Sequence, residues 1–274
     1  MHMGSLREQF DAVMDGISGL ESVRALGKSG GPALPENGES DIDVFVFSRQ
    51  IPTPEERLTA YQKALGDGCD CHASPTGGPF WGVCDFLTIA GTELCLMHFT
   101  TAQMTAEVDA VLSGSRLERE GNYFYPTGRC ASLLSLQVLC DKDGFLAALR
   151  QRVATYPDGL ACAMAQHHLQ KLEDTEDLER GVTRQDPLFY HAALDQALDH
   201  FLQALFAANH VYFPSRKRTM EHLSSFQTLP KDCSERLLQT VEWGAKAETL
   251  ARSYNAWTAL CEELQALVKG EESA

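Results

Sequence analysis

The run Ser40-Asp41-Ile42-Asp43-Val44-Phe45-Val46 places two carboxylates at the start of an apolar segment with the composition of a β-strand. In a strand, residues i and i+2 project from the same face, so the side chains of Asp41 and Asp43 lie on one face, about 7 Å apart. Asp41 by itself is explained by a turn before the strand. Asp43 precedes Val-Phe-Val-Phe directly, and a charge at that depth requires a partner or a metal ion. The pattern therefore predicts a metal site.

Mg²⁺ is the ion that two such carboxylates favour, because it takes oxygen ligands, keeps several waters and bridges protein carboxylates to substrate phosphates. The loop before the strand, residues 27–40, holds four glycines and two prolines and is therefore irregular. Backbone N–H groups of such a loop, together with the Ser29 hydroxyl, are able to approach a phosphate. The loop and the strand together predict a site for a metal ion and a phosphate.

These residues resemble the signature of the polymerase-β-like nucleotidyltransferase superfamily, in which a Gly-Ser loop (here Gly27-Lys28-Ser29-Gly30-Gly31) precedes Ser-Asp-x-Asp and apolar residues. The segment from residue 121 onward also resembles the helical C-terminal domain of an uncharacterised bacterial branch of that superfamily. The resembling pieces are residues 139–144, 156–157 and 205–214. In layout the chain is similar to antibiotic nucleotidyltransferases, in which a helical lobe completes the substrate cleft.

The resemblance implies transfer of a nucleoside monophosphate from a nucleoside triphosphate, ATP first among them, to a hydroxyl of a small-molecule acceptor, with release of pyrophosphate. In that chemistry two metal ions hold the attacking and leaving oxygens in line. Asp41 and Asp43 would ligate the metal ions. The nucleotide-binding residues would be Gly27, Ser29, Gly30, Ser40 and Lys217.

A third carboxylate is expected from a later strand, and here the sequence departs from the superfamily pattern. The position that matches the third Asp is Cys95, whose soft sulfur is a poor ligand for Mg²⁺. Glu93, two residues earlier on the same face, is expected to replace it as catalytic residue and metal ligand, and Asp85 on the preceding strand is a second candidate. If both are ordinary hairpin residues, the chain is a catalytically degenerate relative that binds a nucleotide, or a partner protein, as a regulator.

Hydrophobic periodicity predicts an α+β fold: a small mixed sheet followed by helices. We expect a nucleotidyltransferase-like domain at residues 1–115 and a helical C-terminal domain at residues 116–274. The expected strands are 22–27, 41–47, 81–89 and 92–99. The expected helices are 5–20, 52–65, 101–113, 130–139, 143–154, 158–176, 188–212, 216–224, 231–249 and 251–268.

Charge and composition restrict the classes of partner that we expect this chain to bind. The net charge of −15 disfavours a long nucleic acid, because phosphate binding needs a basic surface and the sequence has one short cationic run, residues 216–218. In that run Lys217 or Arg218 is expected to neutralise triphosphate charge, although the dipole of the preceding helix also accounts for both. Neither an apolar run of about 20 residues nor a signal peptide is seen, so we expect no membrane partner and a cytoplasmic location.

Nine scattered cysteines without a secretion signal indicate reduced thiols. The run Cys69-Asp70-Cys71-His72 offers ligands for zinc, but structural zinc sites favour two or more residues between paired cysteines, and no second pair follows. Zinc is therefore the less favoured interpretation of this run.

Overall fold

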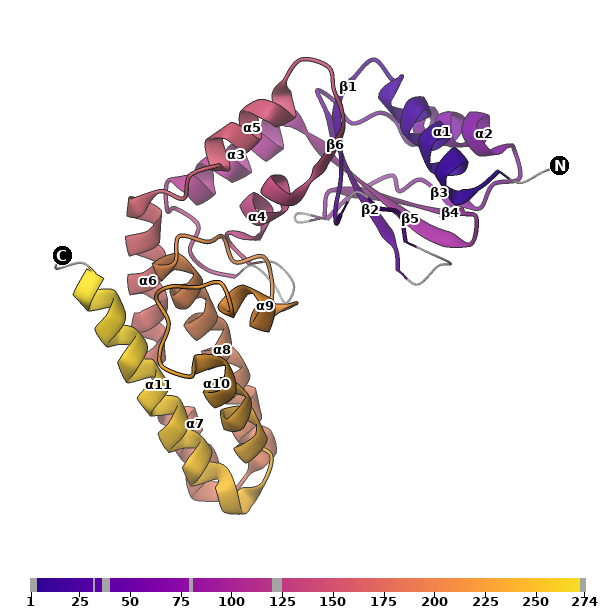
Figure 1. The fold of residues 1–274 in the computed structure, drawn as a ribbon. Coiled ribbons are helices and arrows are strands. Elements are labelled where there is room, and N and C mark those ends of the chain that lie inside the picture. Colours follow the sequence, from indigo (N-terminus) through magenta and orange to yellow (C-terminus); the bar gives the residue numbers. More distant parts are fainter. Residues whose placement is uncertain (1–3, 32, 36–39, 79–80, 120–124, 272–274) are drawn as a thin grey trace. The chain divides into compact units, whose positions relative to one another are not determined.

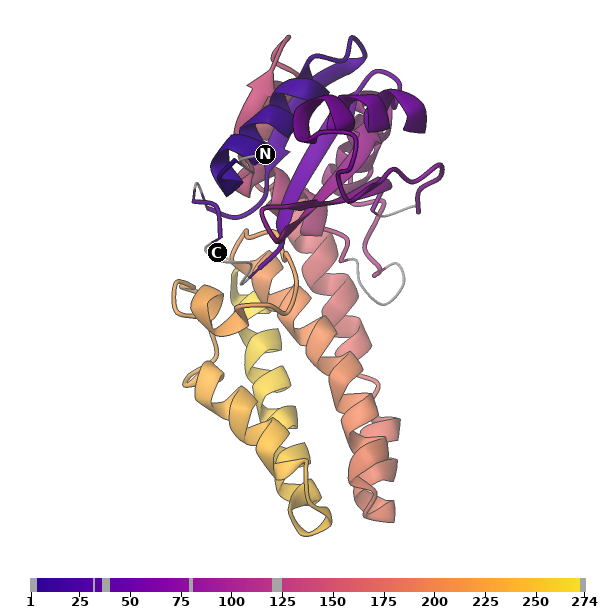
Figure 2. The same ribbon diagram turned by 90° about the vertical axis from the view of Figure 1, so that its right-hand side faces the viewer.

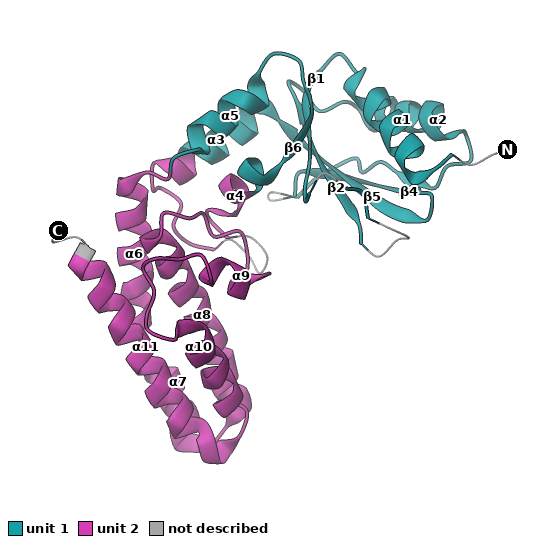
Figure 3. Cartoon of the chain, viewed as in Figure 1, with its two compact units in different colours: residues 1–109, 132–155 teal, residues 110–131, 156–274 magenta. Residues whose placement is uncertain are grey.

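The computed structural model describes residues 4–31, 33–35, 40–78, 81–119 and 125–271. The chain divides into two compact units, one of residues 1–109 with 132–155 and one of residues 110–131 with 156–274 (Figure 3). The sequence pattern predicts one boundary after residue 115. The structure instead returns residues 132–155 to the first unit, because a strand in that segment completes its sheet.

The first unit contains a six-stranded sheet in the order β3-β4-β5-β2-β1-β6 (Figure 1). Strands β2 and β5 pair in parallel, and the other four neighbouring pairs are antiparallel. This mixed sheet and the helices around it confirm the predicted α+β class. The strands are β1 (Val23–Lys28), β2 (Ile42–Ser48), β3 (Cys71–His72), β4 (Val83–Ile89), β5 (Thr92–Thr100) and β6 (Gln137–Asp141).

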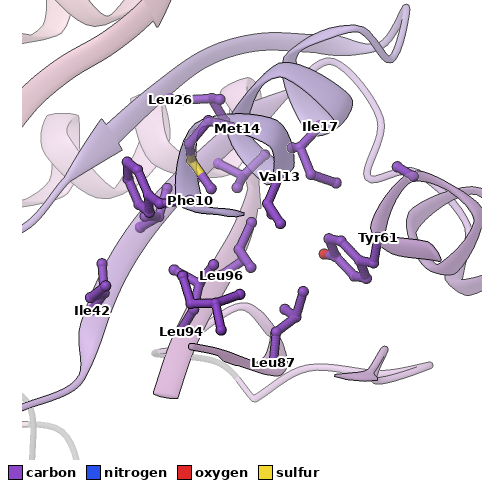
Figure 4. Close-up of a cluster of buried hydrophobic side chains, with 14 of the residues drawn as sticks. Phe10, Val13, Met14, Ile17, Leu26, Ile42, Tyr61, Leu87, Leu94 and Leu96 are labelled. Atoms are coloured by element: carbon purple, nitrogen blue, oxygen red, sulfur yellow. The ribbon is translucent and has the colours of Figure 1, made fainter. Parts of the chain in front are cut away.

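Two helices, α1 (Leu6–Ser18) and α2 (Pro54–Leu65), cover one face of the sheet (Figure 4). Each begins with a capping box, from Ser5 to Glu8 in α1 and from Thr53 to Glu56 in α2. Burial of one large apolar side chain stabilises the fold by about 1.5–3 kcal/mol, so this layer decides which residues of each strand face the helices. On β2 and β5 these are the alternate residues Ile42, Val44, Val46, Leu94 and Leu96.

Aromatic rings fill much of the opposite face. Phe47 of β2 meets Phe145 at the start of α5 (Phe145–Val153), with ring centroids 5.8 Å apart. Phe45, one step closer to Asp43, stacks on Phe99 of β5 at 5.9 Å. Asp43 therefore shares its face with apolar rings, whereas its neighbours in the chain point to the α1 and α2 side. Helix α3 (Thr101–Leu112) follows β5 directly.

The predicted helix at 130–139 is wrong in its second half. Helix α4 (Gly128–Ser135) ends before it, and residues 137–141 form β6, where Leu26 of β1 pairs with Cys140. A short apolar run does not distinguish a strand from a buried helix by periodicity alone, and here pairing with β1 decides.

Among its described residues, the second unit contains helices joined by turns and loops, and no strand. Helices α6 and α8 pack together, as do α10 and α11 (Figure 2). Trp257 of α11 is buried against Phe201 of α8, with ring centroids 5.4 Å apart. In the described part of the chain, no helix has the length and apolar character needed to cross a membrane. The helices are α6 (Asp158–Leu172), α7 (Glu176–Arg184), α8 (Pro187–Ala208), α9 (Thr219–Leu223), α10 (Cys233–Trp243) and α11 (Leu250–Glu271), with a short 3₁₀ turn at Ala247–Thr249.

Candidate functional site

Asp41 and Asp43 lie at the beginning of β2, in the middle of the sheet. Asp43 is the second residue of the strand and is half-buried, and Asp41 comes directly before the strand and is exposed. Ile42 and Val44 are buried among the core side chains that α1 and α2 cover, so the alternation of the strand directs Asp43 to the other face.

Glu93 and Cys95 lie beside these aspartates, because β5 runs parallel to β2 and Cys95 is the register partner of Asp43. The pair before it is Ile42 with Leu94, so one further step brings Glu93 next to Asp41. The pKa of the Cys95 thiol is raised by a hydrogen bond with Cys84 and by burial, and the negative charges of Asp43 and Glu93 raise it further. Both carboxylates therefore lie near the Cys95 sulfur.

Asp85, the second candidate for the third carboxylate, faces the opposite side of the sheet and is wrong for that role. It is fully buried, and its carboxylate forms an ion pair with Arg57 and accepts hydrogen bonds from the Tyr61 hydroxyl (2.5 Å) and the Ser74 N–H (3.0 Å). His98 Nε2 lies 3.1 Å from the same carboxylate. Burial disfavours the charge of Asp85, but His98, Tyr61 and Arg57 outweigh it and hold its pKa below the ordinary value.

The glycine loop joins the carboxylates through the backbone. The Ser29 N–H donates to the Asp43 carbonyl at 2.8 Å and so extends the β1–β2 ladder by one bond. Gly27 lies inside β1, where an added Cβ would come within 2.8 Å of Leu136, so close packing explains this glycine. Gly30 has a φ of +76° and is exposed. Ser40 is exposed directly before Asp41, and residues 36–39 of the loop lie outside the described residues.

Lys28 is a residue of this loop that the sequence pattern does not predict. Its side chain is buried, and its ammonium donates to the carbonyls of Ser29 and Ala33, each at 3.2 Å, and to that of Gly31. Burial lowers the pKa of Lys28, and the charge of Arg7 lowers it further. The only sequence signal is a lysine at the end of a strand, directly before the glycines.

Lys217, the predicted triphosphate ligand, belongs to the second unit, where it is exposed between α8 and α9. The structure therefore leaves its predicted role untested.

The neighbouring residue, Arg216, belongs to a network of ion pairs. Its guanidinium donates hydrogen bonds to Asp195 and Asp199. Asp199 also accepts from the Tyr125 hydroxyl at 2.6 Å and pairs with Arg119. The sequence signal for this network is two aspartates four residues apart, the only acidic residues of a mostly apolar helix.

Among the described residues, no group of three or more His, Cys, Asp or Glu side chains is arranged to hold a metal ion alone. Asp41, Asp43 and Glu93 are thus neighbours on one face but not a closed ligand set. Mg²⁺ is commonly bound by one or two carboxylates, with waters and substrate phosphates completing its shell, and the oxygen donors here fit that pattern.

Residues 125–218 match the model of a domain of unknown function, DUF4037. This segment contains Tyr125, Asp199 and Arg216 of the second unit's ion-pair network. No curated protein matches the chain.

Among solved structures, a nucleotidyltransferase-like protein from Exiguobacterium sibiricum is similar at 10% identity and a TM-score of 0.49, over 98% of this chain and 76% of that chain. A similarity at this level establishes neither a common fold nor a common activity.

Proposed function

We propose that this chain is a Mg²⁺-dependent nucleotidyltransferase, which moves a nucleoside monophosphate from ATP or another nucleoside triphosphate to a hydroxyl of a small-molecule acceptor. The observation that carries the proposal is the placement of Asp43 on β2, and of Asp41 directly before that strand, beside Glu93 on β5. The end of β1 and the beginnings of β2 and β5 lie at the same end of the sheet. The glycine-serine loop therefore begins where the carboxylates gather.

The residues present fit a metal–triphosphate complex. Asp41 and Asp43 would hold Mg²⁺, which neutralises phosphate charge and orients the triphosphate when bound. The Ser29 N–H is already used by the Asp43 carbonyl, so the phosphate contacts in this proposal fall to the Ser29 hydroxyl and the exposed backbone of Gly30 and Gly31. Such a loop is suited to anions because successive N–H groups form a concave donor surface.

Glu93 has the role of general base in this proposal. The acceptor oxygen attacks the α-phosphorus, the bond from that phosphorus to the pyrophosphate oxygen breaks, and the hydroxyl proton passes to Glu93. An exposed carboxylate next to Asp41 is in the right place for an acceptor that arrives from solvent. The proposed setting is the cytoplasm, and it agrees with the nine cysteines, all of them described, which form no disulfide.

The test is pyrophosphate release by the full chain, with each of the four nucleoside triphosphates, Mg²⁺ and a panel of small hydroxyl compounds. We expect release that needs an acceptor and stops when the metal is chelated. Asp67→Asn, which changes an exposed aspartate in the loop after α2, is the matched control and should keep the wild-type rate. The proposal would be excluded if, under every condition tested, the chain neither released pyrophosphate nor showed a shift in melting temperature with Mg-nucleotide.

A second candidate is a catalytically degenerate nucleotide-binding protein. It is favoured by Cys95, which occupies the position beside Asp43 where a third carboxylate would complete the site, and by the open ligand set. In this case Mg-nucleotide raises the melting temperature, since a ligand that binds only the folded state stabilises it, but no acceptor gives turnover.

Glu93 and Cys95 separate the two candidates. If Glu93 is the general base, Glu93→Gln lowers the rate of pyrophosphate release by about 100-fold. The double variant Glu93→Gln/Cys95→Asp should regain part of that rate, because it returns a carboxylate to the position next to Asp43. An unchanged rate in Glu93→Gln would show that Glu93 is not the general base.

A further inference from the structure

Two thiols lie close together at the edge of the sheet. Cys71 is the first residue of β3 and Cys69 lies two residues before it, and their Sγ atoms are 3.0 Å apart. Both side chains are half-buried, so small reagents are able to reach them. The zinc interpretation of this run finds no third ligand among the described residues. The chemistry of the site is therefore that of two neighbouring thiols.

The backbone holds these thiols on one side. Thr88 of β4 donates its N–H to the Asp70 carbonyl and its hydroxyl to the Asp70 carboxylate, each at 2.9 Å. With the middle residue bonded to the neighbouring strand, the residues on either side of it project from the same face. Cys71 packs against the core beneath α2, so that face is the one that α1 and α2 cover.

We propose that Cys69 and Cys71 form a reactive dithiol site, which a peroxide oxidises to an intramolecular disulfide and which a trivalent arsenical bridges. This proposal does not depend on the nucleotidyltransferase activity. The observation that carries this proposal is the distance of 3.0 Å between the two sulfurs.

The oxidation proceeds in two balanced steps. The Cys69 sulfur attacks one oxygen of hydrogen peroxide and becomes a sulfenic acid, while the oxygen–oxygen bond breaks and one water leaves. The Cys71 sulfur then attacks the Cys69 sulfur, the sulfur–oxygen bond breaks, and the Cys71 proton leaves with the hydroxide as a second water. Two thiols lose two electrons in total, and the peroxide takes them.

The two cysteines have different roles because their surroundings differ. Burial raises the pKa of Cys71 to about 12, and the hydrogen bond with Cys69 contributes to this shift. Cys71 therefore keeps its proton in the reduced site, so Cys69 is the sulfur that attacks the peroxide first. Cys71 attacks in the second step, as its proton passes to the departing hydroxide. A disulfide bond is about 2.05 Å long, so the sulfurs must approach by about 1 Å. Gly66 and Gly68, with open space at their Cα atoms, let the preceding loop adjust.

The linkage is tested by protein chemistry on the full chain. Native protein is treated with hydrogen peroxide, its remaining thiols are alkylated, and it is digested with a protease that cleaves before aspartate. Cleavage between Cys69 and Asp70 separates the cysteines, so their fragments stay joined only if a disulfide links them. We expect a joined pair, two hydrogens lighter than the reduced fragments, which dithiothreitol separates.

Variants and a second probe complete the test. Cys69→Ser and Cys71→Ser should each abolish the joined fragments, and Cys162→Ser, which removes an exposed thiol elsewhere, should keep them. Phenylarsine oxide should be retained by the wild type and the Cys162→Ser variant and lost from both pair variants. Separate fragments after oxidation, a bond between Cys84 and Cys95 in place of this one, or equal arsenical retention by all variants would overturn the proposal.

Discussion

Asp43→Asn is expected to lower the rate of pyrophosphate release by about 10³-fold, which is about 4 kcal/mol of transition-state stabilisation. The amide keeps the size of the side chain but removes the negative charge that would hold Mg²⁺. The Asp43 carbonyl, which accepts from the Ser29 N–H, is unchanged, so the β1–β2 ladder should remain. The expected variant is therefore folded and inactive.

Three measurements make this result specific. Pyrophosphate release gives the rate, circular dichroism reports whether the sheet is intact, and a Mg-nucleotide melting shift reports binding. Asp67→Asn serves again as the exposed control. A folded Asp43→Asn variant with more than about one tenth of the wild-type rate would contradict the metal role of Asp43, because a lost ligand to a catalytic metal costs several kcal/mol.

Arg57→Met is expected to lower the free energy of unfolding by about 3–5 kcal/mol. Arg57 is buried, and its guanidinium pairs with Asp85 while also donating to the carbonyls of Ser74 (2.7 Å) and Pro52 (3.0 Å). Its loss leaves the charge of Asp85 buried without its cation. Urea unfolding followed by circular dichroism measures the change.

A double variant shows how much of the loss in stability comes from leaving the buried charge of Asp85 without a partner. Arg57→Met/Asp85→Leu removes both charges, and buried ion pairs replaced by apolar residues are often close to neutral in stability. We expect the double variant to be more stable than Arg57→Met alone. Arg7→Met, which removes a largely exposed ion pair with Asp11, should change stability little. Equal losses in the single and double variants would show that the hydrogen bonds of Arg57, not its charge, stabilise this region.

Local patterns in the sequence predict much of the fold. The strand with Asp41 and Asp43, the hairpin and the first two helices follow from apolar periodicity and from clear start signals such as Thr53 and Pro54. The strand β6 is missed because its identity depends on pairing with β1, from which it is separated by more than 100 residues. Such pairing is a tertiary contact that no local pattern contains.

Within the candidate site, the face of the sheet on which Asp85 lies can be predicted from the sequence. The hairpin turns at Ala90 and Gly91, which both have positive φ, and this two-residue turn pairs Ile89 with Thr92. That register puts Asp85 on the side of Leu87 and Ile89, away from Glu93. By contrast, the pairing of Asp85 with Arg57 and of Arg216 with Asp199 depends on which side chains meet in the folded chain.

The return of residues 132–155 to the first unit limits which fragments of this protein can fold alone and how its two units can have been joined in evolution. The chain passes between the units after residues 109, 131 and 155, so no single cut separates them. A fragment that stops at residue 115 would lack β6 and would expose the edge of β1, an open template for pairing with another chain. Gene fusion of two ready-made domains cannot produce this interleaved order in one step, and a stable N-terminal fragment should extend to residue 155.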